Sequence, residues 1–145
     1  MSKCLKGDFS IEQLNKNATL LQDTLDYLNN INTLCYSKEN ISNNINLLSS
    51  ANFQLLQVSR NLKKLSKEVL DLLPSIDTVT LHSLSKNLIH HYYFVNHAVL
   101  ISFLKSISKN AIRKEITYAL KVIHHTKMRI IYQRKRRPKR NGGIS

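Results

Sequence analysis

Apolar residues near the start of the chain recur at alternating distances of three and four positions. They are Ile11, Leu14, Ala18, Leu21, Leu25 and Leu28. This alternation is typical of the narrow apolar seam of a coiled coil rather than of the broad face of a globular helix. Ser10, with Gln13 three residues further on, has the spacing of a capping box. The pattern therefore predicts a helix that begins at Ile11.

The next seam position is Asn32, and it leaves two interpretations open. A polar seam residue can fix the register and the number of partners of a coiled coil, or the helix can simply end in this Asn-rich stretch. The stretch around Ser37 predicts a break, followed by a second helix from about Lys38 to Leu73 that Pro74 terminates. Its apolar positions are Ile41, Ile45, Leu48, Ala51, Leu55, Val58, Leu62, Leu65, Val69 and Leu72.

These two seams need a surface to pack on, because a single narrow stripe has no core of its own. We therefore expect them to pack on partner helices, in a hetero-oligomer with other helical subunits. The residues that we assign to the partner-helix seam are Ile11, Leu14, Leu21, Leu25, Leu28, Leu55, Leu62, Leu65 and Val69.

Asp77 or Ser75 can cap a third helix, which leads into the strongly apolar stretch 88–107. The length of that stretch raises the question of a membrane span, but three histidines, Asn96 and Lys105 interrupt it. A helix buried in a bundle or at a partner interface fits it better. A last amphipathic helix follows Ser108, and its apolar pattern stops after Gln133. The chain is thus predicted to be all-α, with three or four long amphipathic helices, as a coiled-coil or helical-bundle subunit.

Composition agrees with long helices. Three Gly and two Pro in 145 residues leave few turns, which argues against an all-β sandwich or barrel. The two cysteines, Cys4 and Cys35, are too few for a disulfide framework or a structural zinc site. The first ten residues lack the apolar core of a signal peptide. We therefore expect an intracellular location, in the nucleus or on the cytoskeleton.

The uneven distribution of charge indicates a further partner. The net charge of +13 lies entirely in the second half of the chain. Residues 1–78 contain eight acidic and eight basic side chains, whereas residues 79–145 contain fourteen basic side chains and one acidic one. Such asymmetry indicates an acidic polymer as a partner. We divide the chain into a charge-neutral coiled-coil hairpin (1–76), a basic helical segment (77–133) and a basic disordered tail (134–145).

The tail carries the strongest functional signal. Pro138 and the Gly142–Gly143 pair disfavour a helix there, so we expect disorder until a partner binds. No base-reading signature accompanies the charge, and only Tyr132 could stack on a base. A nucleic acid, an acidic tubulin surface, a nuclear-localisation signal and a merely solubilising end all remain alternatives. The residues assigned to polyanion binding or nuclear localisation are Lys127, Arg129, Arg134, Lys135, Arg136, Arg137, Lys139 and Arg140.

The sequence predicts no catalytic, cofactor or metal site. It has no Gly-rich phosphate loop, nucleophile elbow or paired carboxylates, which argues against an enzyme. His90, His91 and His97 lie on one predicted helix, but no pair of histidines is four residues apart. No acidic residue lies between Asp77 and Glu115 to ligate a metal or to orient a ligand. We therefore interpret the histidines as core or surface residues.

The segment Phe53-Gln-Leu-Leu56, followed by an amphipathic run to Pro74-Ser-Ile76, resembles a small helical subunit of the fungal DASH outer-kinetochore complex. The likeness covers about residues 11–76. It departs from that pattern at residues 57–59, where acidic and proline residues are replaced by Gln, Val and Ser. The resemblance implies a non-enzymatic subunit of a microtubule-encircling assembly. The residue pattern equally allows a nuclear nucleic-acid-binding protein that uses its last helix and tail.

Overall fold

The computed structural model describes residues 4–37, 40–92 and 95–136. These residues contain no strand, so the predicted all-α class is confirmed. Three of the helices are long and the others are short. In order they are α1 (Ile11–Cys35), the 3-10 helix η1 (Ile41–Asn43), α2 (Ile45–Lys64), α3 (Lys67–Leu70), α4 (Thr78–His90), α5 (His97–Ile107) and α6 (Asn110–Arg136).

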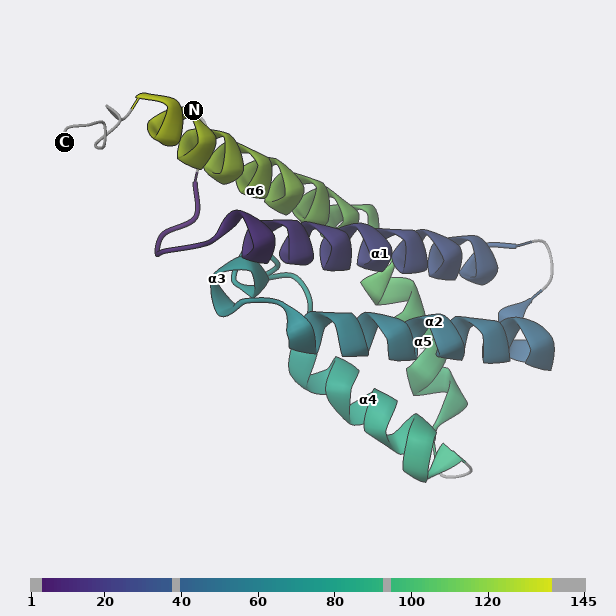
Figure 1. Cartoon of the computed structure of the whole chain (residues 1–145). Helices are drawn as coiled ribbons and strands as arrows, with labels where there is room; N and C mark the ends of the chain where they lie inside the picture. Colours follow the sequence, from purple (N-terminus) through teal and green to yellow (C-terminus); the bar gives the residue numbers. More distant parts are fainter. Residues whose placement is uncertain (1–3, 38–39, 93–94, 137–145) are drawn as a thin grey trace.

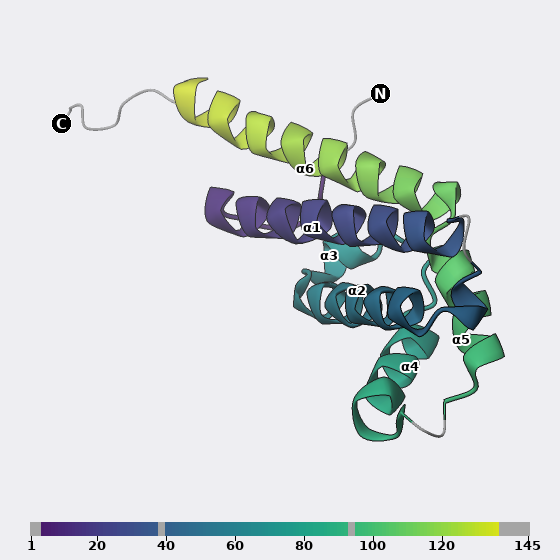
Figure 2. The same ribbon diagram turned by 90° about the vertical axis from the view of Figure 1, so that its right-hand side faces the viewer.

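Helix α1 is the centre of the bundle. It lies between α6 on one side and α2 on the other, and both of these run antiparallel to it (Figures 1 and 2). Helix α5 also packs on α1 and touches η1, whereas α4 packs on α2. One continuous core includes residues of the long and the short helices alike. Described residues of both 1–76 and 77–133 therefore contribute to the same core.

Two predicted helix starts are confirmed. The backbone N–H of Gln13 donates to Ser10 Oγ over 3.0 Å, and the Ser10 N–H donates to Gln13 Oε1 over 2.8 Å, which completes the capping box of α1. At the start of α4, the N–H of Thr80 donates to Asp77 Oδ1 over 3.0 Å. Each cap satisfies backbone N–H groups that have no partner inside the helix.

The predicted second helix is wrong at both ends. It begins at Ile45, because the side chain of Asn44 accepts hydrogen bonds from the N–H groups of residues 46 and 47. Ile45 is consequently 68 % exposed and belongs to no seam. The helix ends at Lys64, not near Pro74, because Ser66 has an extended backbone that the side chain of Asn17 binds.

The apolar stretch 88–107 is likewise divided, because α4 ends at His90 and α5 begins at His97. Asn96 caps α5 by accepting a hydrogen bond from the Val99 N–H over 3.2 Å. Within the described ranges, no helix is long and apolar enough to cross a membrane.

The seam residues are covered by helices of the same chain. Leu14, Leu21, Leu28, Leu55, Leu62, Leu65 and Val69 are buried in the single core, and Ile11 and Leu25 pack against it half-buried. Partner helices are therefore not needed to cover these residues, and the hetero-oligomer stays a prediction. Packing of α2, α5 and α6 around α1 supplies the surface that a lone stripe lacks.

The predicted tail also begins too early. Helix α6 continues through Arg136, so Arg134, Lys135 and Arg136 form its last turn. In that turn the Arg136 guanidinium donates to the Tyr132 hydroxyl, one helical turn back, over 3.3 Å. Arg137, Lys139 and Arg140 lie outside the described residues, as does the rest of the tail.

Candidate polyanion-binding surface

Helix α6 has a buried face and a solvent face that differ sharply in chemistry. Ile112, Ile116, Ala119, Ile123 and Thr126 are buried on one side. Successive residues turn by about 100° around a helix axis, which places Ala111 and seven exposed polar or aromatic residues within an arc of about 80° on the other side. We call those seven residues the outer strip of α6: Lys114, Tyr118, Lys121, His125, Arg129, Tyr132 and Arg136.

The outer strip alternates cations with aromatic rings and contains no acidic residue. Tyr118 is 45 % exposed and Tyr132 is 59 % exposed, so two large rings face solvent. Lys114, Tyr118 and Lys121 also line a shallow hollow of about 290 Å³. The Arg136 guanidinium lies over the Tyr132 ring, 5.5 Å from its centroid. The strip extends for about 33 Å, from the rise of 1.5 Å per residue.

Only part of the predicted polyanion set lies on this strip. Arg129 and Arg136 belong to it, whereas Arg134 and Lys135 leave α6 in other directions. Lys127 lies almost opposite the strip, where its Nζ donates to Asn15 Oδ1 of α1 over 2.7 Å. The five described residues of the predicted set therefore do not share one face of α6.

Two cations of α6 attach the helix to α1 instead of facing solvent. One is Lys127, and the other is Arg113, whose Nη1 donates to Asn29 Oδ1 over 3.1 Å. The single acidic residue of α6, Glu115, accepts hydrogen bonds from the backbone N–H and the hydroxyl of Ser75. These contacts agree with the buried face of α6, which turns toward the bundle and leaves the outer strip on the solvent side.

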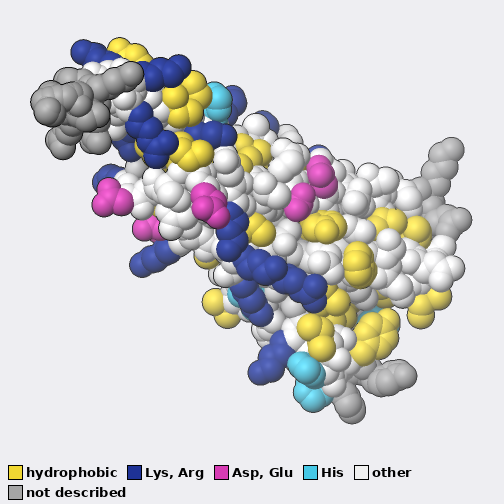
Figure 3. Space-filling model, viewed as in Figure 1, with side chains coloured by type: hydrophobic (Ala, Val, Ile, Leu, Met, Phe, Trp, Pro, Cys, Tyr) yellow, Lys and Arg dark blue, Asp and Glu magenta, His cyan; other side chains and the backbone are white. Residues whose placement is uncertain are grey.

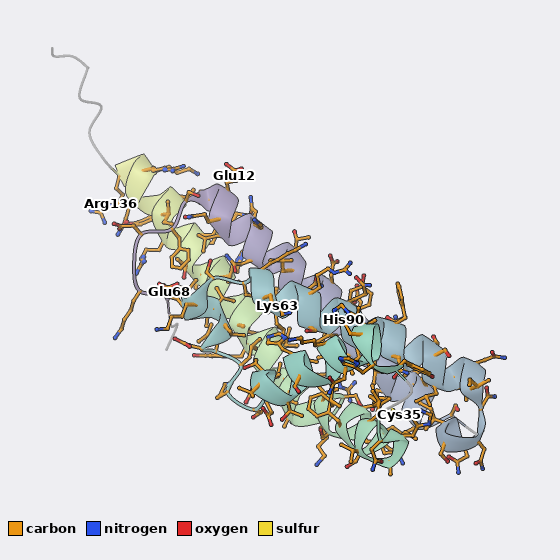
Figure 4. The ribbon with its side chains drawn as sticks, turned by 90° about the horizontal axis from the view of Figure 1, so that it is seen from below. Glu12, Cys35, Lys63, Glu68, His90 and Arg136 are labelled. Atoms are coloured by element: carbon orange, nitrogen blue, oxygen red, sulfur yellow. The ribbon has the colours of Figure 1, made fainter. Side chains whose placement is uncertain are left out.

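The sequence reasoning missed a second basic surface, which lies between α2 and α4. Figure 3 shows Lys and Arg side chains at the outer end of α6 and in a separate band over the C-terminal part of α2. Figure 4 labels Lys63 on α2 and His90 on α4, the two helices that bound a cleft of about 610 Å³. We call it the α2–α4 cleft, and its polar lining includes Arg60, Lys63, His82, Ser85, Lys86 and His90.

A signal for this second surface was present in the sequence. No acidic residue lies between Glu39 and Glu68, although four cations fall in the interval 60–67 at helical spacing. The balanced charge of residues 1–78 as a whole concealed this local excess.

His82 lines the cleft from α4 and is partly buried. Desolvation by burial lowers the pKa of His82 below its usual value, and the nearby positive charge of Lys63 lowers it further. Its Nδ1 lies 2.7 Å from the buried hydroxyl of Ser59. At neutral pH the side chain is therefore a neutral hydrogen-bonding group rather than an additional cation.

Groups suited to metal binding or nucleophilic chemistry do not gather in the described part of the chain. There, no three or more His, Cys, Asp or Glu side chains are placed to hold a metal ion. Cys35 is buried, and its desolvation raises the pKa of the thiol, which disfavours the reactive thiolate. The described surface instead carries positive charge, exposed aromatic rings and the α2–α4 cleft.

No protein family matches the chain, and no significant match was found among curated proteins or solved structures. The resemblance to a DASH subunit therefore stays a prediction.

Proposed function

We propose that the protein is a non-enzymatic helical module that binds an acidic polymer along the outer strip of α6, and that this polymer is a nucleic acid. The observation that carries the proposal is the alternation of exposed cations and exposed tyrosines on one face of a helix. Lys and Arg neutralise phosphates and release counterions. Aromatic rings between them offer surfaces on which unpaired bases stack, and each such stack contributes about 1–3 kcal/mol.

An acidic protein polymer such as a microtubule would use only half of this chemistry. Carboxylates attract the cations, but they provide no planar base for Tyr118 or Tyr132. Single-stranded nucleic acid uses both components. The proposal therefore depends on the tyrosines as much as on the charge.

The test compares the wild type with Tyr118→Leu/Tyr132→Leu, which keeps the charge and the apolar bulk. Fluorescence anisotropy of a labelled single-stranded oligonucleotide measures one affinity, and co-sedimentation with microtubules measures the other. We expect oligonucleotide affinity to fall at least tenfold, from the loss of about 1–3 kcal/mol per stacked base. Unchanged oligonucleotide affinity, or tighter binding to microtubules than to the oligonucleotide, would contradict the proposal.

A second candidate function is a structural subunit of a larger helical assembly, such as the kinetochore assembly that the resemblance over residues 11–76 implies. Two large apolar side chains of α2, Ile45 and Phe53, are exposed and support it. A stoichiometric helical partner that is recovered with the wild type, and lost with Ile45→Ser/Phe53→Ser, would favour this function. A well-folded monomer that recovers no such partner would count against it. Either function implies a location in the nucleus or on the cytoskeleton.

A further inference from the structure

The lining of the α2–α4 cleft includes one buried polar group that lacks a hydrogen-bond partner. Ser85 is only 4 % exposed, and its Oγ has no hydrogen-bond partner within the described residues. A buried hydroxyl without a hydrogen-bond partner destabilises the folded protein. The neighbouring hydroxyl of Ser59 is already occupied by His82 Nδ1. A ligand oxygen in the cleft would remove the penalty at Ser85.

The charge of the cleft specifies an anion. Arg60 and Lys63 approach it from α2, and Lys86 approaches it from α4. Among the described residues, no acidic side chain lines it. Charge-assisted hydrogen bonds from Arg and Lys to phosphate oxygens are about twice as strong as neutral ones. The lining thus combines cations with a hydroxyl donor, the chemistry that recognises phosphate.

The apolar part of the lining indicates that the ligand is more than an inorganic ion. Leu56 and Ile89 line the same cleft from its two sides. The volume of about 610 Å³ falls within the range of small-molecule sites. We propose that the α2–α4 cleft binds a small phosphate monoester with an apolar group, of about the size of a mononucleotide. Ser85 Oγ then donates to a phosphate oxygen, and the three cations balance the charge.

Isothermal titration of the full-length chain with AMP, inorganic phosphate and adenosine tests this proposal. We expect AMP to bind more tightly than phosphate, and adenosine to bind more weakly than AMP. Ser85→Ala and Arg60→Gln should each weaken AMP binding about tenfold, since a hydrogen bond to a charged group contributes about 1.5–3 kcal/mol. Ser85→Ala removes one oxygen from a buried site, so the variant should fold.

The control variant is Lys121→Gln, which removes one cation from the outer strip of α6 and should leave AMP binding unchanged. Equal weakening by Lys121→Gln and Arg60→Gln would overturn the proposal, because it would show unspecific attraction. Equal affinities for AMP and inorganic phosphate, or for AMP and adenosine, would also overturn it. The proposal is independent of nucleic-acid binding by α6, because the two sites share no residue.

Discussion

Asn17→Ala should destabilise the protein far more than a typical substitution of a polar residue. Asn17 is 3 % exposed on α1, and its side chain makes three hydrogen bonds. Its Nδ2 donates to the Gln13 carbonyl and to Ser66 Oγ, each over 2.9 Å, and its Oδ1 accepts from the Ser66 N–H over 2.9 Å. Through Ser66, this one side chain holds the chain extended between α2 and α3.

The size of the effect follows from those three bonds. Each contributes about 0.5–1.5 kcal/mol, and the Ser66 N–H would be left without its partner. Together they predict a loss of about 3 kcal/mol in the free energy of unfolding. This is a large share of the about 5–15 kcal/mol that is usual for a single domain. With a typical dependence on urea, the midpoint of unfolding should fall by about 1–2 M.

Urea unfolding followed by circular dichroism is the suitable assay, because the chain has no Trp. Asn30→Ala is the matched control, since it makes the same substitution on the exposed side of the same helix. Asn30 donates a single hydrogen bond, to Gln54 Oε1 over 3.3 Å, and both substitutions gain the same helix propensity. If the free energies of unfolding of the two variants differ by less than about 0.5 kcal/mol, the stabilisation assigned to the hydrogen bonds of Asn17 is wrong.

Three further predictions concern single side chains. Ser10→Ala breaks the capping box and should cost about 1 kcal/mol in chemical unfolding; no loss would mean that the cap adds nothing. Asn52 is 6 % exposed, and neither polar atom of its amide has a hydrogen-bond partner. Asn52→Leu should therefore increase the free energy of unfolding by about 1–2 kcal/mol and raise the melting temperature. A lower melting temperature would contradict this. The folded pKa of His82 is lowered from 6.5, so the unfolded chain binds this proton more readily. The contribution of His82 to the free energy of unfolding is complete above about pH 6.5 and should decrease as the pH falls toward the folded pKa. His82→Gln should remove this decrease. An identical pH dependence of stability in both proteins would refute the prediction.

Local signals in the sequence predicted the elements that local contacts determine. The capping box at Ser10 and the cap at Asp77 depend on residues three positions apart, and both form as expected. The apolar spacing of α1 identified Leu14, Leu21 and Leu28 as buried. The seam positions between them are only half-buried, and Asn17 and Thr24 are buried instead. In each case the information lies within one or two helical turns.

Contacts between distant residues account for what could not be predicted. The break after Lys64 depends on Asn17, which is 49 residues away from Ser66. The covering of the α1 seam by α6 depends on buried apolar residues of α6 that join the same core, while Arg113 and Lys127 donate to Asn29 and Asn15. No periodicity within a segment contains either contact.

The candidate surface was missed in part for the same reason. The net charge of a long segment does not show which face of a helix each cation occupies, and a binding surface depends on those faces. The rotation of about 100° per residue places Arg129 and Lys127 on different faces of α6, although only one residue lies between them. The α2–α4 cleft required the packing of α4 on α2, which the sequence did not indicate.

The salt dependence of oligonucleotide binding tests the central claim most directly. A variant with Lys114, Lys121, Arg129 and Arg136 changed to Gln loses the four Lys and Arg side chains of the outer strip. The matched control changes Arg60, Lys63, Lys64 and Lys86 to Gln, which removes equal charge from the α2–α4 side. If the strip contacts four phosphates of a single-stranded oligonucleotide, the slope of log affinity against log salt should be smaller in magnitude by about 3 in the strip variant than in the wild type. The slope of the control variant should equal that of the wild type. An unchanged slope in the strip variant, or equal reductions in both, would contradict binding along α6.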